Sequence, residues 1–240
     1  MPDQQLGVIV TGGASGIGAA IVARLMSDGY VVAVLDKQAV RPRDSLHGYE
    51  VDVADFEQVN AAVTHFASQV GPPYGLVNNA GWDRAMAFLK TTPQFWDQVL
   101  DVNLRGPLNV THAALGLMAD AGRGRVVSIA SDAGRVGSSG EAVYSAAKGG
   151  IIALMKTLAR EHARNDITFN TVCPGPTQTP LLDELDETGK LAAALEKAIP
   201  MRRLGQPDDY PGIVSFFLSG DSAYITGQTI SVSGGLSMHG

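Results

Sequence analysis

The segment GVIVTGGASGIG, residues 7–18, begins with β-branched and apolar residues and ends in a glycine-rich turn. The apolar run predicts a buried strand, and the helical spacing of residues 18–28 predicts a helix directly after the turn. Glycines in such a turn let a pyrophosphate approach the backbone at the N-terminus of the helix, where free N–H groups and the helix dipole favour anions. The segment therefore predicts a dinucleotide-binding unit, with an ordinary strand-to-helix turn as the alternative.

The alternation of strand and helix continues along the chain. Further strands are expected at residues 31–35, 75–79, 125–130 and 167–172, and further helices at residues 55–70, 93–118 and 141–165. This pattern is typical of βαβ units, which build a parallel sheet with helices on both faces. We expect an α/β, Rossmann-like, doubly wound fold in a single domain, residues 1–240. Residues 180–207, a polar helical stretch between prolines, are expected to form a lid-like insertion.

Composition limits the class of partner. The 240 residues carry a formal net charge of −6 and contain no block of Lys and Arg, which argues against nucleic acid and anionic membranes. No apolar run approaches the roughly 20 residues that span a bilayer, and the N-terminal sequence has no signal-peptide pattern. The single cysteine, Cys173, is expected to be a small buried filler. We predict a cytoplasmic protein that binds a small molecule and holds no metal.

An acidic residue marks the end of the second expected strand. Asp36 lies 24 residues after Gly12, close to the spacing of about 20 at which a carboxylate accepts hydrogen bonds from an adenosine ribose. A carboxylate there repels the additional phosphate of NADP, so we predict NAD as the cofactor. The neighbouring Lys37 leaves NADP as the less favoured alternative, and a role of Asp36 as a mere strand cap stays open.

Several motifs follow one another in a specific order: TGxxxGxG at 11–18, DV at 52–53, NNAG at 78–81, Asn103, Ser131, YSAAK at 144–148 and PG at 174–175. As a set, with this spacing, they resemble the short-chain dehydrogenase/reductase family along nearly the whole chain. The resemblance implies a homotetramer. One departure is the interval of only 15 residues between Asp36 and Asp52, in which a full helix does not fit, so we expect a shortened connection on the adenine side.

The resemblance implies a catalytic group of Asn103, Ser131, Tyr144 and Lys148. Alcohol oxidation needs a base, and a free tyrosine titrates only at about pH 10. A lysine one helical turn along, together with the positive ring of oxidised nicotinamide, favours the phenolate, so we expect the two charges to lower the pKa of Tyr144. Ser131 is expected to hold the substrate oxygen, and Asn103 a water that relays protons to Lys148. For Asn103 the alternative is an asparagine that merely bends its helix.

The resemblance also implies which residues contact the cofactor. They are Gly12, Ser15, Gly16, Ile17, Gly18, Asp36, Asp52, Val53, Asn79, Ala80, Gly81, Tyr144, Lys148, Pro174, Gly175, Thr177 and Thr179. Asp52 and Val53 are expected at the adenine. Of the two threonines, Thr179 is the preferred partner of the nicotinamide carboxamide. For Asn79, the alternative to a cofactor contact is a purely architectural role.

The stretch SDAGRVGSSGEAVYSAAKGG, residues 131–150, is similar within the family to 2-hydroxycyclohexanecarboxyl-CoA dehydrogenases, and its beginning also resembles dihydrodiol dehydrogenases. Both groups oxidise cyclic secondary alcohols. Four residues that follow strand ends are expected to face the ring of the substrate: Trp82, Asp132, Arg135 and Val136. The alternative is that they are ordinary loop residues. Basic residues of the lid are candidates to bind the phosphates of CoA; they are Lys190, Lys197, Arg202 and Arg203. The alternative is that they have no contact with CoA, because their segment resembles one that many family members share whatever their substrate.

These observations predict NAD-dependent oxidation of a secondary, cyclic alcohol to a ketone, with a cyclic β-hydroxyacyl-CoA as the preferred substrate. The alternatives are an NADPH-dependent 3-oxoacyl-carrier-protein reductase and a dihydrodiol dehydrogenase. A non-catalytic nucleotide-sensing protein of the same fold is the alternative from another class. The presence of both Tyr144 and Lys148 argues against it.

Overall fold

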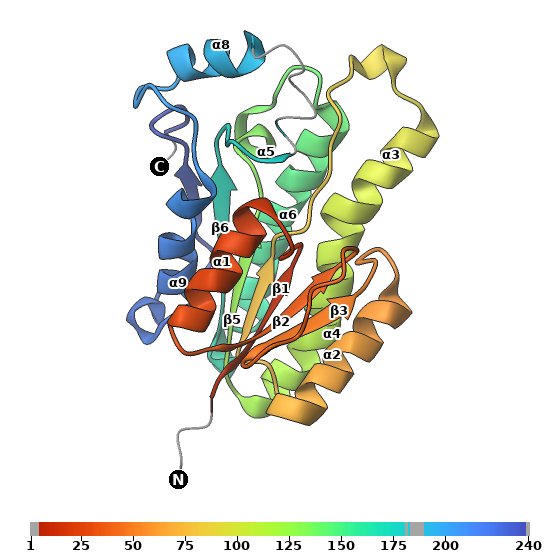
Figure 1. The fold of residues 1–240 in the computed structure, drawn as a ribbon, viewed down its shortest axis with the longest axis vertical. Coiled ribbons are helices and arrows are strands. Elements are labelled where there is room, and N and C mark those ends of the chain that lie inside the picture. Colours follow the sequence, from red (N-terminus) through yellow and green to blue (C-terminus); the bar gives the residue numbers. More distant parts are fainter. Residues whose placement is uncertain (1–4, 181, 183–189, 239–240) are drawn as a thin grey trace.

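The computed structural model describes residues 5–180, 182 and 190–238, which form one α/β domain (Figure 1). Its sheet has seven strands. They are β1 (Gly7–Thr11), β2 (Val31–Asp36), β3 (Leu46–Glu50), β4 (Gly75–Asn78), β5 (Gly124–Ile129), β6 (Ile167–Pro174) and β7 (Thr229–Val232). All neighbouring strands pair in parallel in the order β3-β2-β1-β4-β5-β6-β7. The doubly wound fold expected from the sequence is confirmed.

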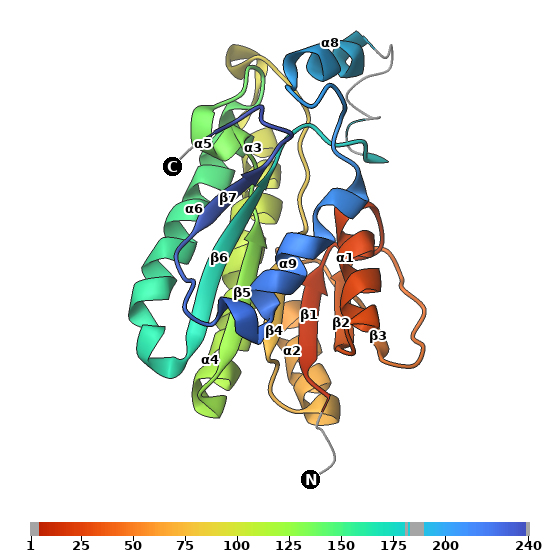
Figure 2. The same cartoon turned by 90° about the vertical axis from the view of Figure 1, so that its left-hand side faces the viewer.

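Helices cover both faces of the sheet. They are α1 (Gly16–Ser27), α2 (Phe56–Val70), α3 (Pro93–Leu100), α4 (Gly106–Ala121), α5 (Ala133–Val136), α6 (Ala142–Glu161), α8 (Lys190–Ala198) and α9 (Pro211–Leu218). Helices α1 and α9 lie side by side on one face, and α2, α4 and α6 cover the other (Figures 1 and 2). Phe66, Met118 and Met155 are fully buried on the second face. Each such side chain stabilises the fold by about 2 kcal/mol through burial.

The order of the strands decides where a ligand can bind. The chain starts at β1 and winds outward through β2 and β3, then returns to β4 on the other side of β1 and continues to β7. In open parallel sheets a crevice forms at this reversal, beyond the carboxyl ends of the strands. Thr11 ends β1 and Asn78 ends β4, so the glycine-rich turn and the NNAG motif meet at the crevice.

The connection between β2 and β3 is short, as the 15-residue interval predicts. Residues 37–45 contain no helix, and an isolated bridge between Arg43 and Leu46 leads into β3. The connection lies directly over the strand, because a Cβ on Gly48 would be 2.0 Å from the carbonyl oxygen of Val40. Val40 packs against the core on the α1 face. A loop therefore replaces the covering helix at this edge.

Three details differ from the sequence-based expectation. The single helix expected over residues 93–118 consists of α3, a π-helical segment at Asp101–Arg105, and α4. Strand β3 was not predicted, because its sequence LHGYE contains a histidine and a glycine in place of a β-branched run. Helix α9 was not predicted either.

The predicted lid is only partly described. Residues 181 and 183–189 lie outside the described residues, whereas α8 lies beyond the carboxyl ends of the strands in both views (Figures 1 and 2). After α8 the chain returns to the end of β6, where the amide of Gly205 donates to Pro176 and its carbonyl accepts from the amide of Gln178, both at 2.9 Å. The described part of the segment is thus anchored beside the crevice.

Candidate active site

The glycine-rich turn packs against the end of β4 with no room for side chains. A Cβ on Gly18 would lie 2.0 Å from the carbonyl oxygen of Gly12 and 2.5 Å from Nδ2 of Asn79. Gly12 has a φ of +65°, and its Cβ would lie 2.8 Å from Cα of Ala80. Only glycine fits these two positions. The structure therefore brings together four of the residues predicted to contact the cofactor.

Asn79 holds the turn through its side chain. Its amide donates to the carbonyl oxygens of Thr11, at 3.1 Å, and Gly12, at 2.9 Å. The hydroxyl of Thr11 accepts in return from the backbone N–H groups of Asn79 and Ala80, each at 3.0 Å. Both amide hydrogens of Asn79 are used, so its architectural role is present in the structure, and its Oδ1 is left to face a ligand.

Helix α1 begins at this turn with an uncapped N-terminus. Ser15 stands at the N-cap with an extended backbone, but its side chain makes no capping hydrogen bond, and the first turn contains no acidic residue. Gly16 has a φ of +53°, and Ile17 packs against the core behind it. Free N–H groups next to a surface without Cβ atoms fit the pyrophosphate of a dinucleotide.

Asp36 lies at the end of β2, beside the same turn. Its carboxylate accepts hydrogen bonds from the backbone N–H of Ala14, at 3.0 Å, and of Gln38, at 2.9 Å. These two bonds fix the carboxylate over the loop that leads into α1. The acid expected near the ribose is thus held at the edge of the crevice.

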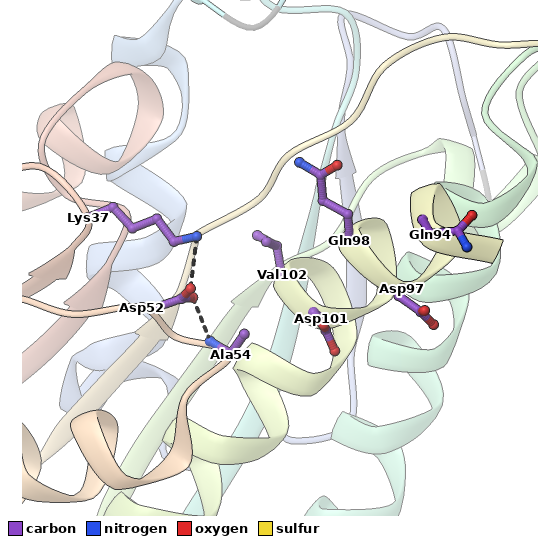
Figure 3. A pocket seen from close by; sticks show the side chains of 8 residues that line it. All are labelled: Lys37, Asp52, Ala54, Gln94, Asp97, Gln98, Asp101 and Val102. Atoms are coloured by element: carbon purple, nitrogen blue, oxygen red, sulfur yellow. Dashed lines mark hydrogen bonds and ion pairs between the residues drawn. The ribbon is translucent and has the colours of Figure 1, made fainter. Parts of the chain in front are cut away.

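A cavity of about 410 Å³ opens next to Asp36, at the end of β3 (Figure 3). Its lining residues are Lys37, Asp52, Ala54, Gln94, Asp97, Gln98, Asp101 and Val102. Lys37 forms an ion pair with Asp52 at 2.9 Å across one side of it. Burial opposes ionisation of Asp52, but hydrogen bonds from Lys37 and from the N–H of Ala54 outweigh it and hold the pKa of that carboxyl below its usual value. Polar groups and a concave shape at this position fit an adenine.

Val53 lies below the cavity and is buried. A Cβ on Gly106 would lie 2.7 Å from Cγ2 of Val53, so the start of α4 touches this residue directly. Asn109 of α4 donates to the carbonyl oxygens of Val53, at 3.0 Å, and Ala54, at 3.1 Å. The backbone of Val53 is thereby fixed beneath the place expected for the adenine.

The segment after β6 reaches from the crevice to the glycine-rich turn. The carbonyl of Pro174 accepts from the N–H of Asp132, and the N–H of Gly175 donates to Val232. Thr177 is buried, and its hydroxyl bonds to the carbonyl of Gly175 at 2.8 Å and to the hydroxyl of Tyr210.

The second threonine lies closer to the turn. Cγ2 of Thr179 lies 3.6 Å from the position of a Cβ on Gly16, and its hydroxyl donates only a long hydrogen bond, of 3.4 Å, to the carbonyl of Thr177. Because the hydroxyl of Thr177 is hydrogen-bonded to Gly175 and Tyr210, Thr179 stays the preferred candidate for a cofactor contact.

Ser131, Tyr144 and Lys148 meet at the carboxyl end of β5. Ser131 follows this strand, and its hydroxyl accepts from the N–H of Ala133 at 3.1 Å and hydrogen-bonds with the hydroxyl of Tyr144. Tyr144 and Lys148 lie one turn apart in α6. Lys148 is 3% exposed, and its Nζ donates to the carbonyl of Ile129 at 3.0 Å. The predicted serine, tyrosine and lysine therefore form one cluster.

Charges and burial set the acidity of this cluster. Burial lowers the pKa of Lys148 to about 8. Burial, followed by the charge of Glu141, raises the pKa of Tyr144 well above its ordinary value, and the hydrogen bond with Ser131 opposes this shift only in part. The described protein groups raise the pKa of Tyr144, so the lowering expected from Lys148 together with oxidised nicotinamide stays a prediction. Nζ of Lys148 lies over the ring of Tyr144, 5.5 Å from its centre.

Asn103 lies in the π-helical segment and is fully buried. Its amide donates to the carbonyl oxygens of Trp82, at 2.6 Å, and Val99, at 2.9 Å, while its Oδ1 accepts from the N–H of Trp82 at 3.3 Å. A Cβ on Gly81 would lie 3.1 Å from this Oδ1 and 3.4 Å from Nζ of Lys148. Asn103 and Lys148 thus approach the same point, and one lone pair of Oδ1 stays available for a water.

Sequence reasoning missed Asp83, which follows the NNAG motif by two residues. It is 4% exposed, and its Oδ2 has no hydrogen-bond partner among the described residues. Burial raises its pKa to about 6, and the charge of Glu141 adds to this shift. Its charge acts on both Tyr144 and Lys148. An acidic residue next to NNAG was the available signal.

The four residues expected to face a substrate ring lie in different surroundings. Trp82 packs edge-on against Phe95, with ring centres 5.9 Å apart, and Val136 is exposed. Asp132 and Arg135 both bond to the hydroxyl of Ser231 and so tie the end of β5 to β7. These two side chains therefore have a structural role.

Two other predictions concern the basic residues of the lid and the cysteine. Arg203 forms two hydrogen bonds with Asp209, at 2.6 and 2.8 Å, and Arg202 bonds to the carbonyl of Lys197. The side chain of Lys190 lies outside the described residues. Cys173 is fully buried, and burial raises its pKa to about 11, as expected for an inert filler.

Comparison with known proteins identifies the family. The family model adh_short_C2, described as enoyl-(acyl carrier protein) reductase, matches residues 12–237. The chain belongs to the short-chain dehydrogenase/reductase family. Within the family, it is 40% identical to the acetoacetyl-CoA reductase of Shinella zoogloeoides over 233 residues, covering 95% of this chain and 96% of that one. It is 37% identical to the 3-oxoacyl-[acyl-carrier-protein] reductase MabA of Mycobacterium avium over 231 residues, covering 96% and 89%.

A solved structure of the family gives the same result for the fold. An actinorhodin polyketide ketoreductase variant with NADPH aligns with a TM-score of 0.90 at 32% identity, covering 98% of this chain and 99% of that one. The protein is therefore an NAD(P)-dependent oxidoreductase that acts on hydroxyl and keto groups. The two curated relatives are an acetoacetyl-CoA reductase and a 3-oxoacyl-[acyl-carrier-protein] reductase, so a specific relation to 2-hydroxycyclohexanecarboxyl-CoA dehydrogenases is not supported.

No helix among the described residues is long and apolar enough to cross a membrane. Likewise, no group of three or more His, Cys, Asp or Glu side chains in this part of the chain is arranged to hold a metal ion.

Proposed function

We propose that the protein interconverts a 3-hydroxyacyl thioester and the corresponding 3-oxoacyl thioester with NAD(H). The observation that carries the proposal is the cluster of Ser131, Tyr144 and Lys148 at the crevice, in a chain whose relatives act on acetoacetyl-CoA and 3-oxoacyl carrier protein. A β-hydroxyacyl-CoA with the hydroxyl on a ring belongs to the same chemical class. The named relatives therefore favour the alternative drawn from the sequence, a 3-oxoacyl-carrier-protein reductase, over the oxidation of a cyclic alcohol.

Each residue of the cluster has its own role in the proposed reaction. The hydroxyl of Ser131 holds the substrate oxygen, and Tyr144 takes its proton as the base, or returns it during reduction. Lys148 supplies positive charge beneath the tyrosine ring and a hydrogen-bond donor for the nicotinamide ribose. The oxidised nicotinamide supplies the hydride acceptor. Asn103 holds a water through its remaining lone pair.

The preference for NAD is part of the proposal. The carboxylate of Asp36 would repel the additional phosphate of NADP, and Lys37, the nearest cation along the chain, is engaged by Asp52 at 2.9 Å. NADPH is the cofactor of the related polyketide ketoreductase, so the opposite preference has a precedent in the family. A direct comparison of the two cofactors decides between them.

A cyclic substrate is the second candidate, and Trp82 favours it. Its backbone is clamped on both sides by Asn103, so the indole projects from a fixed point next to Gly81. A flat, rigid side chain suits contact with an alicyclic ring. Cyclic β-hydroxyacyl-CoA thioesters and free cyclic dihydrodiols both present such a ring.

The experiment measures turnover of a panel of substrates with each of the two cofactors, and the absorbance of the reduced cofactor is the readout. The panel contains acetoacetyl-CoA, 3-hydroxybutyryl-CoA, 2-hydroxycyclohexanecarboxyl-CoA, 3-oxoacyl carrier protein, a cyclic dihydrodiol and a simple secondary alcohol. Turnover of the thioesters with NAD(H) at a higher kcat/KM than the free alcohols supports the proposal. Turnover of the dihydrodiol alone would favour that alternative, and no turnover of any member would contradict the proposal.

Three further expectations belong to this proposal. The described part of residues 180–207, which includes α8, acts as a lid over the thioester, and exposed Lys197 is the basic residue best available to its phosphates. The protein forms a homotetramer, as its family resemblance implies. It works in the cytoplasm, where acyl thioesters and dinucleotides are present.

A further inference from the structure

Asp83 is a buried acid that the proposed chemistry does not use. It lies on the segment between β4 and α3, two residues after Gly81, and is 4% exposed. The backbone N–H of Arg84 is its hydrogen-bond donor, whereas its Oδ2 has no partner among the described residues. A buried carboxylate oxygen without a partner costs free energy, so such a group calls for a functional explanation.

The position of Asp83 relative to the catalytic cluster suggests that explanation. Its segment packs against the loop before α6, since the N–H of Met86 donates to the carbonyl of Gly140 at 2.7 Å. The charged and titratable groups that act on it are Glu141, Lys148 and Tyr144, all on or at the start of α6. Lys148 is the one cation among these three.

Proton release is a step that needs an acceptor, and among the described residues the buried carboxylates are Asp83 and Asp132, of which Asp132 is bonded to Ser231. Oxidation frees one proton per turnover, and Tyr144 must lose it again through Lys148 before the next cycle. Asn103, the expected end of the relay, cannot store a proton because an amide does not titrate, and both its amide hydrogens are already bonded. Asp83 is a carboxylate with an unpartnered oxygen, its charge acts on Lys148, and it lies two residues after Gly81, whose added Cβ would be 3.4 Å from Nζ of Lys148.

We propose that Asp83 is the positioning residue that receives the proton from Lys148 during alcohol oxidation and returns it during ketone reduction. The inference rests on the proposed function of Tyr144 and Lys148. In oxidation, the substrate O–H bond breaks and its proton passes to the phenolate oxygen of Tyr144, while the C–H electron pair leaves as hydride to the oxidised dinucleotide. Lys148 then donates a proton from its ammonium group to a carboxylate oxygen of Asp83, and the neutral Nζ takes up the proton of the Tyr144 hydroxyl. Tyr144 and Lys148 end in their starting forms, and Asp83 ends as a neutral acid.

The pKa of Asp83 supports this role, because burial raises it to about 6, where the carboxyl changes charge near neutral pH. Oxidation requires the ionised form, so its rate rises with pH through this value. Reduction requires the neutral form, so its rate falls through the same value. A purely electrostatic effect on Tyr144 has the opposite sign for oxidation, since ionised Asp83 raises the pKa of Tyr144 and so lowers the fraction of phenolate.

The test is the pH profile of kcat/KM in both directions for four proteins. Wild type is expected to show a limb near pH 6 that is rising for oxidation and falling for reduction. Asp83→Asn removes both limbs and lowers oxidation at pH 8 by about tenfold. Asp83→Glu keeps a carboxyl and keeps the limbs. Glu141→Gln is the matched control, because it removes a charge that raises the pKa of Asp83 and therefore moves the limb to lower pH without abolishing it.

Two results would overturn the inference. One is an unchanged limb in Asp83→Asn, and the other is a limb of the opposite sign in wild type. Infrared spectra of the protein without substrate provide a second measurement, in which a protonated carboxyl band that titrates near pH 6 is expected in wild type and not in Asp83→Asn. If no protein turns over any substrate of the panel, the proposed function fails, whereas the infrared titration still reports on Asp83.

Discussion

Nζ of Lys148 lies 5.5 Å from the centre of the Tyr144 ring, one turn along α6. Its pKa is about 8, so it is mostly charged at pH 7 and favours the phenolate. We expect Lys148→Met to lower oxidation at pH 7 by at least about 100-fold and to move its rise to higher pH. Lys156→Met, an exposed change on the same helix, is the control and leaves the profile unchanged. A wild-type profile in Lys148→Met would contradict this role.

Cofactor preference is expected to depend on two carboxylates. Asp36→Ser removes the charge that repels the 2′-phosphate, and we expect the ratio of kcat/KM for NADP over NAD to rise by at least about tenfold. Asp52→Asn releases Lys37 from its 2.9 Å ion pair, so the double variant is expected to gain more than Asp36→Ser alone. Asp44→Asn, an exposed change in the same connection, is the control. The role of Asp36 is disproved if the ratio is the same in all four variants.

The glycine-rich turn has no room for a side chain at Gly18, so substitution there is expected to disturb both folding and cofactor binding. Gly18→Ala places a Cβ 2.0 Å from the carbonyl oxygen of Gly12, so we expect loss of NAD binding and destabilisation by about 2 kcal/mol. Gly116→Ala lies in α4 with nothing within 4 Å of the new Cβ. That control is expected to stabilise the protein by about 0.5–1 kcal/mol. Thermal unfolding and cofactor titration check both variants, and normal NAD binding by Gly18→Ala would show that the turn is not the cofactor site.

Asn103 is expected to be required for stability as well as turnover. Asn103→Ala removes three hydrogen bonds that join the π-helical segment to Trp82 and Val99. With two backbone carbonyls left without their donor, the free energy of unfolding should fall by about 2–3 kcal/mol. Asn60→Ala, an exposed change in α2, is expected to cost less than about 0.5 kcal/mol. Equal denaturant midpoints for the two variants would contradict the clamp.

The fold and the main cluster follow from local sequence, whereas other features depend on packing. The turn at residues 11–18 and the pair Tyr144 and Lys148 are set by glycine conformation and helical spacing, both of which are visible in the sequence. The shortened connection after Asp36 also follows from residue counting. These predictions required only chain geometry and short-range chemistry.

Long-range contacts explain what the sequence did not reveal. Strand β3 has a weak strand sequence and forms because it pairs with β2. The π-helical segment arises where Asn103 bonds to Trp82, 21 residues away. The altered acidity of Asp83 comes from burial against the start of α6, and the raised pKa of Tyr144 comes from burial and Glu141. No local pattern reports burial of this kind.

The central claim is that Tyr144 exchanges the proton with the substrate oxygen. The most direct measurement compares Tyr144→Phe with Tyr224→Phe, a change at a fully exposed ring, in turnover of the preferred thioester and in NAD binding. Tyr144→Phe is expected to lose at least about a thousandfold in kcat while NAD affinity stays close to wild type, because only the hydroxyl is removed. Tyr224→Phe is expected to match wild type in both. A Tyr144→Phe variant with wild-type turnover would contradict the account.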